Sequence, residues 1–229
     1  MLKRKRQRLN LLFGFFFISL IIAFILNMIY APIPPGSVIT DTIILILYFL
    51  TYFFLCFGIV FILIVHMIIV ESTVIYSIKR QNRYILFYGL ILFIGMLILV
   101  IIGLVLREPG SDRPLYGVDP DPLQGYVPQW GPVFLAYVLS IVSIFTIIPI
   151  IRTSLKIYSS IKTKALKRKW LYYFIGSLGL IFVYYIMMID NLGPELLGDN
   201  FRLITSVLGV TVIIWGYLMY YGIGFKLKQ

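Results

Sequence analysis

The sequence has very few of the residues that carry redox, metal or acid–base chemistry. Only one cysteine and one histidine occur in 229 residues. Cys56 therefore has no partner for an intramolecular disulfide, and a zinc site of the H-E-x-x-H type cannot be assembled. The motifs of a phosphate-binding loop and of a serine nucleophile elbow are also missing. We expect no catalytic residues, no cofactor and no metal, and we predict that the protein is not an enzyme.

Charged residues are also scarce, and they avoid the long apolar stretches. Acidic and basic residues make up 13% of the chain and hydrophobic residues 61%, compared with an apolar content of roughly 45 to 50% in soluble domains. No Lys, Arg, Asp or Glu lies in the central part of an apolar run. Carboxylates buried in the membrane serve proton pumps and ion-coupled carriers. Their absence from the runs argues against those classes.

Six apolar runs are long enough to cross a membrane as helices, because about 20 helical residues span a hydrocarbon layer of about 30 Å. The first run is too long for a secretory signal and lacks an A-x-A cleavage site, so we interpret it as a retained helix. The predicted fold class is all-α, a polytopic helical membrane protein that forms a single transmembrane domain over residues 1–229. The six predicted transmembrane helices cover residues 9–30, 43–70, 84–106, 133–155, 170–189 and 203–223.

The charges outside the runs are sorted by sign. Of the 20 basic residues, 17 lie in the N-terminal segment, the tail and the connections that follow the second and fourth runs, whereas eight of the nine acids lie on the other side. The positive-inside rule places the basic side, with both termini, in the cytoplasm. We expect a multi-pass protein of the plasma membrane. Contact with anionic lipid headgroups explains the net charge of +11, so membrane lipid is an expected partner and nucleic acid is not.

The longest connection, residues 107–132, lies on the predicted outer side. It contains six prolines and four glycines, which disfavour a helix and favour turns and extended segments. Tyr116, Tyr126 and Trp130 are expected to pack this connection onto the helix ends. It is therefore predicted to be a structured extracytoplasmic loop.

Four residues near the predicted outer ends of the helices are candidates for ligand binding. Asn27 lies near the end of the first run, and Tyr184, Tyr185 and Asp190 lie near the end of the fifth. They could line a shallow pocket that faces outward. Helix packing and anchoring at the membrane interface explain the same four residues and remain the alternative.

Three other titratable residues receive simpler interpretations. His66 is expected near the cytoplasmic interface, where its side chain would be solvated or would face lipid. A role in pH sensing is the alternative, because histidine titrates near neutral pH. Asp119 and Asp121 are interpreted as solvated loop acids, with calcium ligation as the alternative.

Proline and glycine residues in the runs indicate where helices bend or approach one another. Pro149 removes the helical donor for the Phe145 carbonyl, so we expect a kink in the fourth helix, with the hydroxyls of Ser143 and Thr146 nearby to compensate. Small residues allow close approach of helices. The glycines interpreted in this way are Gly176, Gly179, Gly209 and Gly216.

The end of the chain resembles a known family. The stretch Arg168-Lys169-Trp170-Leu171-Tyr172-Tyr173-Phe174-Ile175-Gly176, followed by an apolar hairpin and Tyr220-Tyr221-Gly222-Ile223-Gly224, resembles the closing helices of archaeal membrane sensor domains. These domains are similar to the N-terminal seven-helix sensor regions of some histidine kinases. The resemblance covers about the C-terminal third. It departs from the family in having six predicted helices and no kinase.

The function predicted from the sequence is that of a sensor-like or ligand-binding domain without its own output domain. Such a domain needs a cytoplasmic or membrane protein partner to receive its output. A weak similarity between segments 75–88 and 157–174 leaves a small transporter for an uncharged or lipidic solute as an alternative. An accessory subunit of a membrane complex is a third possibility.

Overall fold

The computed structural model describes residues 2–34, 36–75, 77–106, 116–119, 128–192, 197 and 199–223. The chain divides into two compact units, Met1–Ile150 and Ile151–Gln229, which are described separately below. Within the described residues, six helical stretches are long and apolar enough to cross a membrane. This confirms the all-α class with six candidate spans and indicates a membrane-embedded protein. The organisation as one domain stays a prediction.

The helices extend beyond the apolar runs, mainly into basic segments. Helix α3 (Ile78–Val105) begins after Ser77, whose hydroxyl accepts a hydrogen bond from the Arg80 backbone N–H. Helix α6 (Lys164–Asp190) likewise begins before the apolar run that opens at Trp170. Lysine, arginine and glutamine are good helix formers. The helices therefore continue through charged residues that a search for apolar runs leaves out.

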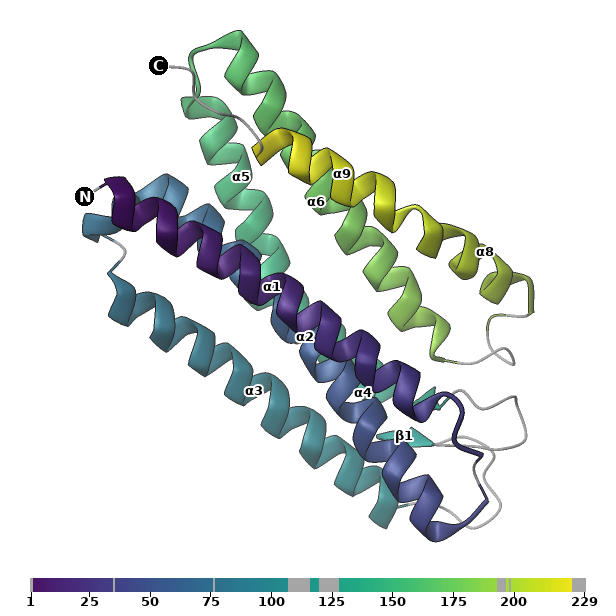
Figure 1. Ribbon diagram of the computed structural model, residues 1–229. Helices are drawn as coiled ribbons and strands as arrows, with labels where there is room; N and C mark the ends of the chain where they lie inside the picture. The colour runs from purple at the N-terminus through teal and green to yellow at the C-terminus, as the bar shows by residue number, and fades with distance from the viewer. Residues whose placement is uncertain are drawn as a thin grey trace. The chain divides into compact units, whose positions relative to one another are not determined.

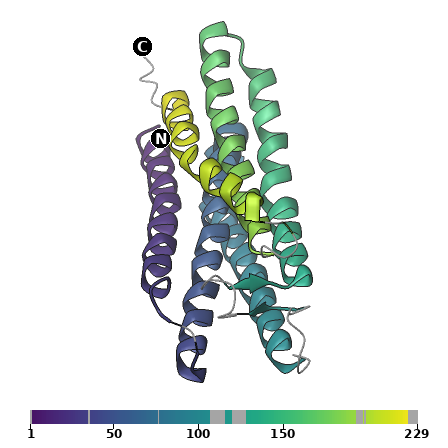
Figure 2. The same cartoon turned by 90° about the vertical axis from the view of Figure 1, so that its right-hand side faces the viewer.

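The first unit is organised around α2. In the apolar stretch of α2, 61% of the residues are buried, compared with 22% in α1 and 28% in α3. Helix α1 packs along α2, and α3 packs on both α2 and α4 (Figure 1; Figure 2 shows α1 beside α2 from another side). The helical elements of this unit, besides α3, are α1 (Leu2–Tyr30), α2 (Val38–Ile75), α4 (Pro132–Val142) and the π-helix η2 (Ser143–Ile147).

The described part of the long connection forms a small antiparallel ribbon. Strand β1 (Val118–Asp119) pairs with β2 (Gln129–Trp130). The Trp130 ring is 2% exposed, and its centroid lies 4.7 Å from that of Tyr52 in α2 and 4.9 Å from that of Phe134 in α4. Within the described part of the connection, the extended structure is thus confirmed, and Trp130 packs against the interior of α2 and the start of α4. Tyr126 and Asp121 lie outside the described residues.

The sequence predicted that Asp119 is a solvated loop acid, and this prediction is wrong. Its side chain is only 6% exposed, and it lies opposite Gln129, which is also buried. The adjacent Gly117 has a φ of +76°, and a Cβ atom there would lie 3.0 Å from the Leu99 carbonyl oxygen. This close approach places the start of the ribbon directly against α3.

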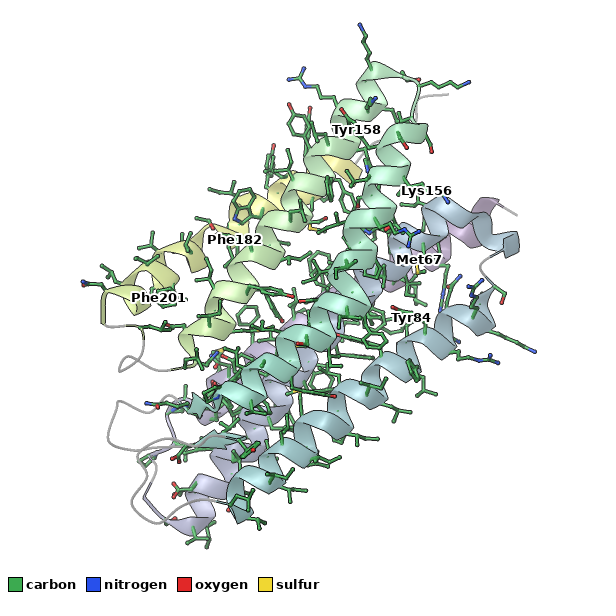
Figure 3. The ribbon with its side chains drawn as sticks, turned by 180° about the vertical axis from the view of Figure 1, so that it is seen from behind. Met67, Tyr84, Lys156, Tyr158, Phe182 and Phe201 are labelled. Carbon is green, nitrogen blue, oxygen red and sulfur yellow. The ribbon has the colours of Figure 1, made fainter. Side chains whose placement is uncertain are left out.

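A π-helix precedes Pro149 in the fourth span. Because Pro149 has no N–H group, the Phe145 carbonyl lacks its usual helical donor. The Tyr84 hydroxyl of α3 donates to this carbonyl oxygen at 2.6 Å (Tyr84 is labelled in Figure 3). Widened turns of this kind break the regular ladder of backbone hydrogen bonds, so the fourth span is irregular just before Pro149. The predicted kink itself stays a prediction.

The donor to Phe145 differs from the one expected. The hydroxyls of Ser143 and Thr146 donate to the carbonyls of Leu139 and Val142, one turn earlier in the helix. A hydroxyl on a helix reaches back along its own chain. Tyr84 reaches the Phe145 carbonyl because it comes from a neighbouring helix.

The second unit is built on the pairing of α6 with α9. Thr211 interrupts the sixth span, and the Thr211 hydroxyl donates to the Leu208 carbonyl while its oxygen accepts from the Trp215 indole N–H. The fourth span reaches this unit through α5, which crosses the boundary between the units. The helices other than α6 are α5 (Ile148–Ser160), α8 (Asp199–Val210) and α9 (Val212–Ile223).

The sequence predicted that four glycines allow helices to approach closely, and two of them do lie where helices meet. A Cβ on Gly176 would lie 2.7 Å from the Trp215 carbonyl oxygen, and one on Gly179 would lie 2.2 Å from the Trp215 ring. The predicted role is confirmed at these positions. It is wrong for Gly209 and Gly216, where a Cβ would meet nothing within 4 Å.

Candidate functional site

The candidate residues from the sequence are divided between the two units. Asn27 is an exposed residue of α1, and its side-chain oxygen accepts a hydrogen bond from the Tyr30 hydroxyl. Tyr184, Tyr185 and Asp190 are half-buried residues near the end of α6. The pocket that would join Asn27 to these three residues stays a prediction.

The three α6 candidates point in different directions around their helix. Each residue of an α-helix is rotated by about 100° from the one before it. Tyr185 is thus rotated by roughly 100° from Tyr184, and Asp190 by a further roughly 140°. No single face of α6 carries all three side chains, which favours the alternative of packing and anchoring for at least part of the set.

His66 lies in the interior of the first unit. Its side chain is 0% exposed, and its Nδ1 atom lies 2.8 Å from the Ile62 carbonyl oxygen. The expectation of a solvated or lipid-facing side chain is therefore wrong. The physical reason is that α2 is the central helix, so neighbouring helices cover a position that lies near an end of the apolar run.

A groove lies between α1, α2 and α3 of the first unit. Its cavity volume is about 710 Å³. Its lining residues come from α1, α2 and α3, and these three helices can be followed in Figure 1. We call it the phenylalanine groove. It is lined by Arg8, Leu12, Phe15, Phe53, Phe57, Phe61, Asn82, Ile85, Leu86, Gly89, Leu90 and Phe93.

One face of each helix supplies the lining. Phe53, Phe57 and Phe61 follow one another at intervals of four residues, so they form a single row along α2. The α3 residues from Asn82 to Phe93 recur at intervals of three and four, which also places them on one face. The sequence reasoning missed this row. The spacing of the three phenylalanines was the available signal.

Aromatic contacts hold the floor of the groove in shape. The rings of Phe53 and Phe57 are stacked with centroids 5.4 Å apart, and Phe57 and Phe61 meet edge to face at 5.3 Å. Phe93 approaches Phe53 from α3 at 5.2 Å. A Cβ on Gly89 would lie 2.8 Å from the Phe57 ring. Because Gly89 has no side chain, the Phe57 ring can pack directly against the backbone of α3.

The mouth of the groove is polar and carries a positive charge. Arg8 of α1 is half-buried there, and its Nη2 donates to the Asn82 side-chain oxygen at 2.7 Å. Its Nε donates to the Gln81 side-chain oxygen at 3.3 Å, and Gln81 is buried. These two bonds join the start of α1 to the start of α3. We call this end of the first unit the basic end.

The lining residues suit binding rather than chemistry. Aromatic and aliphatic side chains provide apolar surface, and an arginine and an amide provide hydrogen-bond donors at one end. Such a combination of an apolar wall with a few polar groups is typical of small-molecule sites. Within the residues that the structure describes, no three His, Cys, Asp or Glu side chains are grouped so that they could hold a metal ion.

No protein family, no curated protein and no solved structure matches the chain. The resemblance to archaeal sensor domains therefore stays a prediction, and the phenylalanine groove is the basis for a functional proposal.

Proposed function

We propose that the protein is an integral membrane protein that binds the apolar chain of an amphiphilic ligand in the phenylalanine groove. The observation that carries this proposal is a groove of about 710 Å³ with five phenylalanines in its lining. The proposal keeps the sequence-based hypothesis of a ligand-binding domain. It assigns the binding site to the basic end of the first unit instead of the predicted outer ends of the helices.

The proposed orientation follows from the charge distribution. Seventeen of the 20 basic residues belong to segments on one side of the six spans, and the positive-inside rule makes that side cytoplasmic. Both termini are then cytoplasmic, and the mouth of the groove at Arg8 lies at the cytoplasmic face of the plasma membrane. The output of ligand binding passes to a protein partner, because no residue of the groove suggests catalysis.

The length of the groove supports an acyl chain as its occupant. From Asn82 to Phe93, α3 rises by about 16 Å, which is close to half of a hydrocarbon layer of about 30 Å. A groove with a polar mouth at the interface and an apolar base near the bilayer centre matches one leaflet. Its volume also falls in the range of about 300 to 1,000 Å³ that is common for ligand sites.

The proposal is tested with a neutral amphiphile whose chain forms a covalent adduct. A monoacylglycerol with a diazirine in its acyl chain is added to vesicles that contain the protein, and the adducts are mapped by mass spectrometry. We expect labelling of the α1, α2 and α3 residues that line the groove. Gly89→Leu fills the groove beside Phe57, so it should reduce that labelling about tenfold.

A matched variant and a second filling variant complete the test. Gly14→Leu makes the same change on α1, where a Cβ would meet nothing within 4 Å, so labelling should be unchanged. Leu86→Trp adds bulk at the rim of the groove. The Leu86 side chain is 63% exposed, so the larger side chain should leave folding unchanged. Labelling that stays at the wild-type level in both Gly89→Leu and Leu86→Trp would overturn the proposal.

A further inference from the structure

The mouth of the groove contains a fixed positive charge whose described partners are both neutral. Arg8 donates hydrogen bonds to the side-chain oxygens of Gln81 and Asn82. An amide oxygen orients a guanidinium group without neutralising its charge. Arg8 is thus held at the entrance of an apolar groove with its positive charge retained.

The guanidinium group has hydrogen-bonding capacity left over. Arginine carries five N–H donors, and the two bonds that the structure describes use the Nε and Nη2 groups. The planar donors of arginine match the oxygens of a phosphate in a bidentate arrangement. Asn82 also lines the groove, and its amide NH₂ supplies further donors at the same place.

The rim of the groove indicates where the occupant comes from. Leu86 and Leu90 are 63% and 49% exposed, and Phe15 is 40% exposed. In a bilayer these side chains face lipid tails, so the groove is open sideways to the surrounding leaflet. A membrane lipid can enter it without leaving the bilayer, with its headgroup at the interface beside Arg8.

On the basis of the proposed function, we propose that the occupant of the groove is an anionic phospholipid of the surrounding leaflet. One acyl chain lies along Phe53, Phe57 and Phe61, and the phosphate is bound by Arg8 and Asn82. The charge of Arg8 makes the site select for net negative headgroups. The protein would then report the anionic lipid content of its own membrane.

The test uses three probes with the same diazirine-bearing acyl chain. They are phosphatidylglycerol, phosphatidylcholine and the free fatty acid, each added in trace amounts to phosphatidylcholine vesicles that contain the full-length protein. We expect phosphatidylglycerol to label the groove about tenfold more than phosphatidylcholine, and more than the fatty acid. Preferential labelling by the fatty acid would overturn the assignment to a phospholipid.

Two substitutions, each removing one positive charge, distinguish lipid binding at a specific site from attraction by the general surface charge. Arg8→Gln should abolish the preference for phosphatidylglycerol while labelling by phosphatidylcholine continues. Arg83→Gln should keep the preference, because Arg83 is an exposed residue of the same helix end that does not line the groove. Asn82→Leu, at an exposed position, should lower the preference without disturbing the fold.

The outcomes distinguish this inference from the proposed function on which it rests. Equal labelling of the groove by all three probes would overturn headgroup selection and leave the apolar groove in place. An equal loss of preference in Arg83→Gln and Arg8→Gln would show that surface charge alone attracts the lipid. Failure of every probe to label the groove would overturn the proposed function itself.

Discussion

At the scale of single residues, tyrosine hydroxyls join α3 to the elements around it. Tyr84 donates to the Phe145 carbonyl in η2, Tyr88 donates to the Cys56 carbonyl in α2 at 3.0 Å, and Tyr137 of α4 donates to the Ile91 carbonyl at 2.7 Å. A backbone carbonyl in an apolar environment is costly to leave without a donor. The bond from Tyr84 is distinctive because Pro149 has removed the helical donor.

The substitution Tyr84→Phe tests this role of the hydroxyl. It removes the donor to Phe145 and should lower the free energy of unfolding by about 1 to 2 kcal/mol. Tyr220→Phe makes the same chemical change on a side chain that is 74% exposed and should have a much smaller effect. The stability of both variants is measured by denaturant unfolding in detergent micelles. An equal stability of Tyr84→Phe and Tyr220→Phe would contradict the proposed role of the Tyr84 hydroxyl.

At the scale of elements, the contact between α6 and α9 depends on backbone proximity. A Cβ on Gly176 would lie 2.7 Å from both the Met219 nitrogen and the Trp215 carbonyl oxygen. These are backbone atoms, so they cannot move aside as a flexible side chain would. Four glycines received the same interpretation from the sequence, and only the structure shows that Gly176 and Gly179 face a partner helix.

The substitution Gly176→Ala should separate the two helices. Inserting a methyl group into a well-packed contact costs typically about 1 to 3 kcal/mol, and we expect a matching loss of stability with altered Trp215 fluorescence. Gly216→Ala adds the same methyl group to α9 in open space, so it should be neutral or stabilise the helix by up to about 1 kcal/mol. A stability of Gly176→Ala equal to that of Gly216→Ala would refute the close contact.

At the scale of the whole molecule, six spans and a one-sided distribution of basic residues predict the orientation in the membrane. The only cysteine, Cys56, is fully buried. The native protein should therefore react poorly with maleimides. New cysteines at exposed positions of opposite ends can report orientation against this low background.

The variants Ala31→Cys and Ser159→Cys test the orientation. Both positions are exposed, one after α1 and the other at the end of α5. In intact cells a membrane-impermeant maleimide should label Ala31→Cys, whereas Ser159→Cys should react only after permeabilisation. Labelling of Ser159→Cys in intact cells would reverse the proposed orientation and place the mouth of the groove outside.

The sequence by itself determined the six spans, the loss of the helical donor to the Phe145 carbonyl and the extended structure around Trp130. These follow from local properties, namely the length of apolar runs, the missing N–H of proline and the turn-forming residues of the long connection. The charge pattern likewise gave a definite prediction of orientation. None of these inferences needs to know which helices are neighbours.

Only the tertiary structure decided which side chains meet. The burial of His66 and Asp119, the bond from Tyr84 to Phe145 and the gathering of Phe53, Phe57 and Phe61 beside Arg8 all depend on neighbouring elements. In a helix that crosses a membrane, the lipid-facing and packed sides are similarly apolar, because lipid tails are as apolar as leucine. The apolar pattern of a single helix therefore does not reveal which of its faces another helix covers.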